Sequence, residues 1–167
     1  KADEVLALAR KHFGALPARA LPPRKPETEP AQVGEKRIVV KAPAQLPYLL
    51  MAWHAPTLKD WAQDSTPYAL QILAGVLSGN DSARLQKTLV KTQLIAVNAS
   101  AGYDAVARGP GMFMVDATPA PGKTVAALEK AIRDELKRVQ REGISEAELA
   151  RVKAQVIAAD VYQRDSL

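Results

Sequence analysis

Cysteine is absent from the chain of 167 residues. Its absence excludes a disulfide framework, a thiolate nucleophile and every cysteine-ligated zinc or iron–sulfur site. It does not identify the compartment, because proteins without disulfides occur both in the cytosol and in the periplasm. Long apolar runs are also absent: the longest, residues 48–55, is far shorter than the roughly 20 residues that cross a bilayer. The sequence therefore predicts no membrane span and leaves the localisation unknown.

Histidine is scarce and occurs only as His12 and His54. The residues three positions further on are Ala15 and Thr57, which supply no second zinc ligand at a common spacing. We therefore predict no metal site in this chain. His12 ends a predicted helix, where its partial positive charge complements the helix dipole, and His54 ends a predicted buried strand. A structural role is favoured for both side chains.

Acidic residues are fewer than basic ones, and the 23 lysines and arginines give a formal charge of +5. Residues 1–41 hold nine of the basic and five of the acidic side chains, so most of the excess lies in this stretch. The stretch is rich in proline and lacks interleaved aromatic rings, whereas a nucleic-acid surface needs clustered cations and usually stacking rings. This pattern disfavours nucleic acid as a partner, and a nucleic-acid or phosphate binder is only a third hypothesis.

Complete catalytic motifs are absent as well. Gly122-Lys123-Thr124 resembles the end of a phosphate loop, but Ala117 stands where that loop needs a glycine. No serine lies in a Gly-x-Ser-x-Gly elbow. The helical acids are more typical of solvated surface than of acid–base pairs; they are Asp134, Glu135, Glu146 and Glu148. We predict no catalytic residue in this chain.

The first third of the chain reads as a short helix followed by a linker and two strands. Residues 2–13 have apolar side chains at helical spacing, acids in the first turn and Gly14 at the end. Residues 15–35 contain five prolines among charged residues and cannot form a core. β-Branched and aromatic residues then predict strands over 36–42 and 46–55.

The remainder predicts alternating pairs of helices and strands. Thr66 as N-cap and Pro67 at the first helical position start one helix that Gly79 ends, and residues 80–82 start another. Strands are expected over 94–103 and 112–117, then helices over 123–141 and from the capping box of Ser145 and Glu148 onward. The order predicts an α+β fold, a largely antiparallel sheet with helices packed on one face.

Several short motifs, in this order, resemble one family, the pitrilysin/insulinase-type zinc metallopeptidases. The resemblance is to the C-terminal, non-metal-binding half of the bacterial zinc proteases related to mitochondrial processing peptidase. The residues that carry it are Lys11-His12-Phe13-Gly14, the linker 29–37, Met51-Ala52-Trp53-His54-Ala55-Pro56, Ala69 to Leu73, Leu77 to Leu85, and Gly143 to Leu149.

The resemblance implies a two-half enzyme of which this chain is a part. In such peptidases two homologous halves face each other across a chamber, and the first half binds zinc through a His-x-x-Glu-His motif and a later Glu. Residues 1–14 would then be the terminal helix of the preceding zinc domain, 15–35 the interdomain linker, and 36–167 the second, half-chamber domain, truncated at its C-terminus. Zinc would belong to the full-length parent, and this fragment alone is expected to be inactive.

The resemblance also points to two substrate-binding positions in this chain. The family's non-metal half often presents an Arg and, seven residues later, a Tyr that hold the peptide backbone opposite the zinc. Alignment of residues 89–97 puts Val90 at the Arg position and Val97 at the Tyr position. The pair is therefore absent, which suits family members in which a homologous partner subunit supplies it. The alternative is that both valines pack in the core.

The leading hypothesis is that the parent is a zinc endopeptidase or oligopeptidase and that this half closes the peptide-binding chamber. Its partners would be a peptide or unfolded protein substrate, the zinc-bearing half of the same chain and a homologous subunit. The alternative is a non-catalytic scaffold or partner subunit of the same superfamily. A chamber protease must hold extended segments, so we also expect peptide capture along the strand of residues 94–103. The bacterial relatives suggest a periplasmic location.

Overall fold

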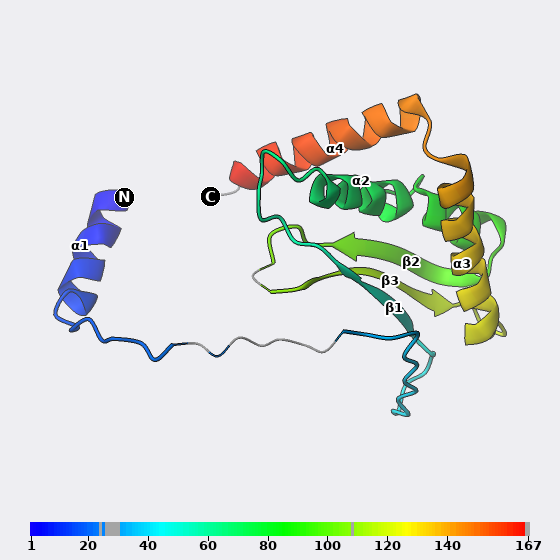
Figure 1. The fold of residues 1–167 in the computed structure, drawn as a ribbon, viewed down its shortest axis with the longest axis horizontal. Coiled ribbons are helices and arrows are strands. Elements are labelled where there is room, and N and C mark those ends of the chain that lie inside the picture. Colours follow the sequence, from blue (N-terminus) through cyan, green and yellow to red (C-terminus); the bar gives the residue numbers. More distant parts are fainter. Residues whose placement is uncertain (24, 26–30, 108, 166–167) are drawn as a thin grey trace. The chain divides into compact units, whose positions relative to one another are not determined.

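A computed structural model describes residues 1–23, 25, 31–107 and 109–165 (Figure 1). The chain divides into two compact units, residues 1–41 and 42–167. Helix α1, Ala2–Phe13, is the regular element of the first unit, and none of its residues is buried. Asp3 and Glu4 lie in its first turn and three basic residues in its last, an arrangement that complements the helix dipole. The helix predicted over 2–13 is confirmed.

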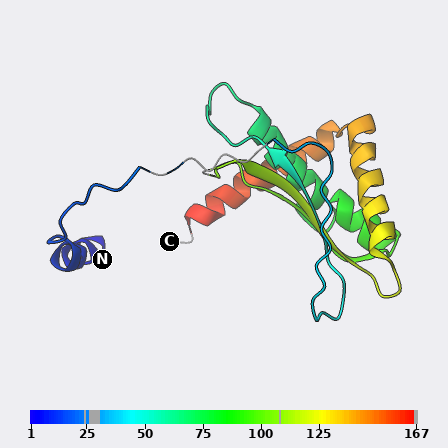
Figure 2. The same ribbon diagram turned by 60° about the horizontal axis from the view of Figure 1, so that its bottom comes forward.

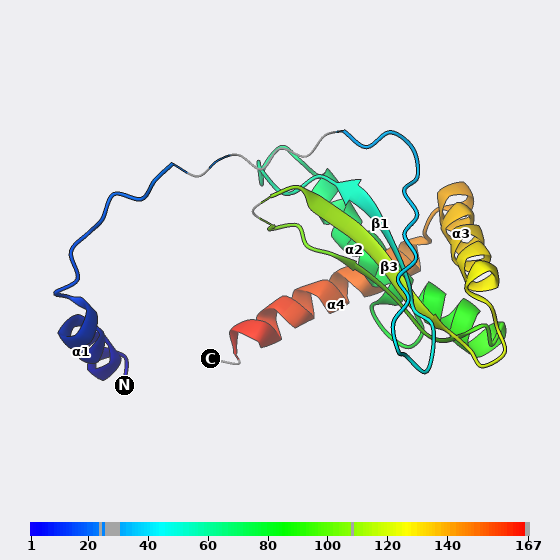
Figure 3. The same cartoon turned by 90° about the horizontal axis from the view of Figure 1, so that it is seen from below.

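The second unit is built on a three-stranded antiparallel sheet. Strands β1 (Leu49–Ala55), β2 (Ala96–Tyr103) and β3 (Gly111–Pro119) have the spatial order β1-β3-β2, so the last strand in sequence is central. Met51 pairs with Val115 on one side of β3, and Ala101 pairs with Val115 on the other. The strands lie in front of α2 in Figure 3, which views the molecule from below.

Helices cover one face of this sheet. Helix α2 (Thr66–Ser78) packs on β2, and α4 (Glu146–Arg164) packs on α2. The π-helix η1 (Gln86–Thr92) packs on β2, and α3 (Val125–Glu142) packs against η1 and β3 (Figure 2). These elements form the predicted α+β fold, with an antiparallel sheet and helices on one face.

The core lies between the sheet and the helices. Alternate residues of β3 point to the helices and are buried, among them Phe113, Val115 and Ala117. The fully buried helical side chains that meet them there are Leu77, Leu89, Leu128 and Ile132. Met112 and Met114 point to the opposite face and are exposed, because successive strand residues alternate between faces. The sheet therefore has one covered and one open face.

The strand predicted over residues 36–42 is wrong. These residues form neither strand nor helix, and Ile38, Val39 and Val40 are exposed. Their β-branched composition suits a strand, but a strand exists only when a neighbour accepts its main-chain hydrogen bonds, and composition does not show whether that neighbour is present. The other predicted strands form, with shifted ends, as β1, β2 and β3.

Two local predictions about helices need correction. The helix expected after Asn80 forms as the π-helix η1 rather than as an α-helix. The α2 N-cap is Ser65 without a side-chain cap bond, and Asp64 accepts the backbone N–H of Thr66 instead.

The predicted domain boundaries at residues 14 and 35 stay predictions. No helix within the described ranges combines the length and apolar character needed to cross a bilayer.

Candidate functional site

The junction from η1 to β2 is the segment where the resemblance places substrate-binding residues. A π-helix is rare and is frequently found at functional sites. Here it is followed by Leu94 at φ 49°, in the left-handed region that side chains other than glycine seldom adopt. Hydrogen bonds hold both sides of this turn: Ile95 N donates to Leu89 O at 2.9 Å, and Ala120 N donates to Ile95 O at 2.9 Å.

Val90 and Val97 lie on either side of this turn and differ in their surroundings. Val90 is half-buried and packs against the core cluster, whereas Val97 is 51% exposed. The interpretation that both valines pack in the core is therefore wrong for Val97. Neither side chain can donate a hydrogen bond to a peptide backbone. Their correspondence to the family's Arg and Tyr stays a prediction.

The outer edge of β2 is occupied by side chains of the neighbouring helices. Ser78 Oγ donates to Ala101 O at 2.8 Å and accepts from Ala101 N at 2.8 Å. Gln86 Nε2 donates to Ala99 O at 2.9 Å. A peptide that added to this edge would have to displace these bonds, so the structure disfavours the expected capture along residues 94–103. A lone Ser and Gln in helices gave no sequence signal for this role.

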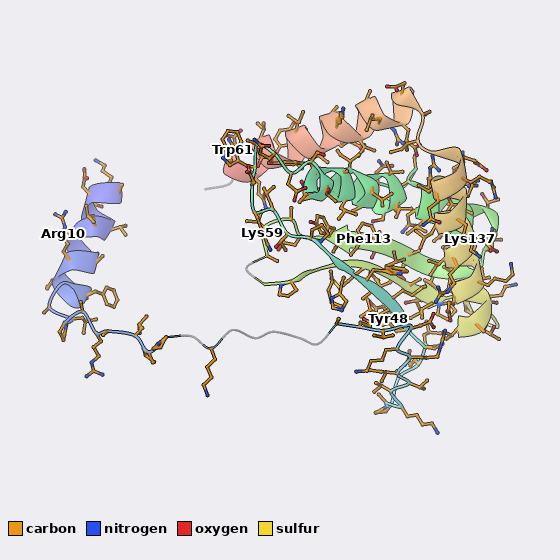
Figure 4. All side chains as sticks on the ribbon, in the orientation of Figure 1. Arg10, Tyr48, Lys59, Trp61, Phe113 and Lys137 are labelled. Atoms are coloured by element: carbon orange, nitrogen blue, oxygen red, sulfur yellow. The ribbon has the colours of Figure 1, made fainter. Side chains whose placement is uncertain are left out.

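The open sheet face carries both apolar and polar side chains. Leu50, Met112 and Met114 are exposed on it. The Ser100 hydroxyl donates to the Asp116 carboxylate across the β2–β3 pair. Desolvation, together with a hydrogen bond to Asp116, raises the pKa of Tyr48 above its usual value. Figure 4 shows Tyr48 where the chain enters β1.

A polar groove lies on the helical side of the unit, among η1, α3 and α4. Its volume is about 550 Å³, and its lining is Ser82, Arg84, Lys87, Thr88, Thr92, Gln93, Arg138, Glu148 and Arg151. Arg84 donates from Nε and Nη2 to the two carboxylate oxygens of Glu148, at 3.0 and 2.7 Å, and from Nη2 to Gly143 O at 2.9 Å. This bidentate contact ties the segment before η1 to the start of α4.

Two acids predicted to be solvated are not. Glu135 is 3% exposed and accepts from Arg138 Nη2 at 2.7 Å, and Glu148 is bound by Arg84. The hydrogen bond from Arg84 lowers the pKa of Glu148 below its usual value. Ser145 Oγ accepts from Glu148 N at 3.2 Å, so half of the predicted capping box forms, while the Glu148 carboxylate binds Arg84. Both acids are ion-paired, which is a structural rather than an acid–base arrangement.

The residues present do not fit a zinc ion. His12 lies in the last turn of α1 in the first unit, and His54 lies in β1 opposite Met112 in the second. Over the described ranges, no group of three or more histidines and carboxylates could hold a metal. Zinc chemistry, if the parent performs it, needs ligands from outside these residues.

Comparisons with known proteins agree on one family. The profile of the peptidase M16 inactive domain matches residues 1–156. A protease from Helicobacter pylori is 26% identical with a TM-score of 0.82, over 99% of this chain and 40% of that one. A peptidase M16 inactive domain from Pseudomonas fluorescens is 16% identical with a TM-score of 0.56, over 68% of this chain and 26% of that one.

A third solved structure is similar to this chain over about two thirds of its length. It is a candidate zinc protease from Bordetella pertussis Tohama I, 22% identical with a TM-score of 0.56, over 67% of this chain and 59% of that one. No curated protein matches the chain significantly. This chain spans less than two thirds of the length of each of the three structural relatives. With its profile match over residues 1–156, the chain belongs to the peptidase M16 family as an inactive domain.

Proposed function

We propose that the parent protein is a zinc peptidase in which this domain forms the chamber wall opposite the metal-binding half. The observation that carries the proposal is the match to the inactive domain of a peptidase family, in a chain whose described residues contain no group able to hold a metal. Metal ligands and a general base would then come from the other half. This domain would contribute surface and shape to the chamber.

The open sheet face supports a role for this domain in contacting substrate, with metal binding left to the other half. It exposes Leu50, Met112 and Met114 beside the polar pair of Ser100 and Asp116. Scattered apolar side chains contact an extended chain of almost any sequence, because apolar burial is non-directional. We propose that this face contacts peptide or unfolded protein substrates with little sequence preference.

Val90 and Val97 bear on which subunit of the parent binds the substrate backbone. Two aliphatic side chains at these positions offer neither a charge nor a hydroxyl to a peptide carbonyl. We propose that a homologous partner subunit supplies this grasp to the parent. The same two valines favour a second candidate function, in which the parent is a non-catalytic scaffold subunit of the superfamily.

The experiment is to measure zinc content and peptidase activity of the full-length parent, with and without its homologous subunit, beside the 167-residue chain alone. We expect a zinc-bound parent whose activity a chelator abolishes, and a chain that is inactive and retains no zinc after dialysis. Restoring zinc after chelation should restore activity. A parent without zinc and without activity, even when its partner is added, would overturn the peptidase proposal and support the scaffold.

A further inference from the structure

The polar groove among η1, α3 and α4 has an excess of positive charge. Its lining includes four cationic side chains, Arg84, Lys87, Arg138 and Arg151, and a single carboxylate, Glu148. Outside the lining, buried Glu135 pairs with Arg138, and Glu142 is near enough to Arg84 and Arg138 to interact with both charges. Cations that line a concave surface focus their field on its interior, where an anion gains most from it.

Two of the four cations are held in place. Both carboxylate oxygens of Glu148 fix the Arg84 guanidinium, and its side chain is only 17% exposed. Arg138 is held by buried Glu135 at 2.7 Å and by Thr88 Oγ1 at 3.4 Å. These contacts order the guanidinium groups before any ligand arrives, so binding would cost little side-chain entropy.

The other two cations have no such partner. Lys87 and Arg151 are exposed, and no carboxylate of the described residues lies within ion-pair distance of either side chain. Arg151 is close enough to Glu148 to help lower the pKa of that carboxyl. Cations that form no ion pair, beside ordered ones, are available to a ligand from solution.

The remaining lining consists of neutral hydrogen-bonding groups: the hydroxyls of Ser82, Thr88 and Thr92 and the amide of Gln93. The Thr92 hydroxyl already donates to Lys87 O at 2.8 Å. The Thr88 hydroxyl accepts from Arg138 and so keeps its own hydrogen to donate. Every lining residue ends in a polar or charged group, although the aliphatic stems of these side chains also line the groove. The groove therefore suits a fully charged ligand.

We propose that this groove binds a compact polyanion of the phosphate class, either free or as the phosphate chain of a nucleotide. Arginine and lysine together with hydroxyl donors match the acceptor oxygens of phosphate groups. A volume of about 550 Å³ holds more than one phosphate group. The site is separate from the open sheet face and does not depend on zinc.

The test is calorimetric titration of the 167-residue chain with inorganic pyrophosphate, ATP and a hexaglutamate peptide. Pyrophosphate should bind, and K87Q/R151Q should weaken it at least about tenfold, since two charge-assisted contacts are lost. If pyrophosphate binds and ATP does not, the ligand is the free anion. If both compounds bind, the ligand is a phosphate chain that a nucleoside can carry. Each single variant, K87Q and R151Q, should show part of the loss.

The matched control is K59Q/K123Q, which removes two exposed cations outside the groove and the same formal charge. It should leave the pyrophosphate affinity unchanged, which separates the groove from general attraction to a basic protein. Thermal unfolding of every variant verifies the fold. Equal loss in both double variants, no pyrophosphate binding to the native chain, or binding of hexaglutamate alone would overturn the proposal.

Discussion

Arg84 and Glu148 join parts of the chain that are 64 residues apart, and both side chains are largely buried. The hydrogen bond from Arg84 lowers the pKa of Glu148 in the folded state. A carboxyl whose folded pKa is depressed contributes stability above its unfolded pKa of about 4.3 and loses that contribution as the pH falls through the folded value. The ion pair therefore stabilises the domain at neutral pH and not in strong acid.

Replacement of Glu148 by Gln tests this linkage. We expect Glu148→Gln to lower the free energy of unfolding by about 1 to 2 kcal/mol at pH 7, because one charged partner of Arg84 is lost. The difference from the native chain should shrink as the pH falls below the unfolded pKa of about 4.3, and it should vanish once the pH has passed the lowered folded pKa and the native carboxyl is protonated too. Urea unfolding from pH 7 to pH 3 measures both effects.

The control is Asp134→Asn, because Asp134 forms an exposed ion pair with Lys130 at 2.6 Å. Solvent and salt screen such a pair, so this variant should unfold much like the native chain at neutral pH. A Glu148→Gln variant whose deficit stays constant down to pH 3 would show that lost packing, rather than lost charge, destabilises it.

Individual residues also show which contacts a sequence predicts and which it does not. The spacing of Ser145 and Glu148 predicted the start of α4 within one residue. It did not predict that the Glu148 carboxylate binds Arg84, because that partner is distant in sequence and a helix surface gives no signal for it. Glu135 was predicted to be solvated but is buried, for the same reason: its burial follows from the packing of α3 on η1. Local patterns report local structure, and long-range pairs arise from packing.

Helices α2 and α4 approach closely where one of them has no side chain. A Cβ added to Gly75 would lie 2.7 Å from Val152 Cγ1, and Val152 is 1% exposed. Valine is stiff at χ1 and cannot easily turn its methyl group away. Gly75 therefore sets the distance between the two helices, although glycine inside a helix lowers helix propensity by about 1 kcal/mol.

Gly75→Ala is consequently expected to destabilise the domain by about 1 to 3 kcal/mol, because overpacking outweighs the gain in propensity. Val152→Ala alone should cost about 2 kcal/mol through the cavity it leaves. The double variant should lose less than the sum, since the smaller side chain removes the clash. Gly102→Ala is the matched control, with no atom within 4 Å of its added Cβ. Additive losses in the double variant would contradict this contact.

The elements themselves were largely predictable from apolar periodicity and capping signals. The exceptions share a cause, which is dependence on a neighbour. Residues 36–42 have strand composition but no strand conformation, and the segment after Asn80 has helical periodicity but π-helical hydrogen bonding. The edge of β2 was expected to accept a peptide, yet Ser78 and Gln86 already bond to it. Propensity describes a segment alone, whereas these outcomes depend on what lies beside it.

The distribution of buried residues over the whole chain bears on its domain organisation. Among the residues that the structure describes, every buried apolar residue of the core lies between Met51 and Val152. Helix α1 buries none of its residues, and an isolated helix of 12 residues is only marginally stable in water. The predicted domain of residues 36–167 therefore contains the side chains that stabilise the fold.

We expect a chain shortened to residues 36–167 to fold alone and to unfold at the same temperature as the 167-residue chain, since no core contact is lost. The comparison chain is 1–143, which lacks α4; it should unfold at a clearly lower temperature, because Val152 no longer covers α2 and Arg84 loses Glu148. Calorimetric scans of the three chains measure this. A large loss of stability in 36–167 would show that residues before 36 stabilise the fold and that the domain boundary at residue 35 is wrong.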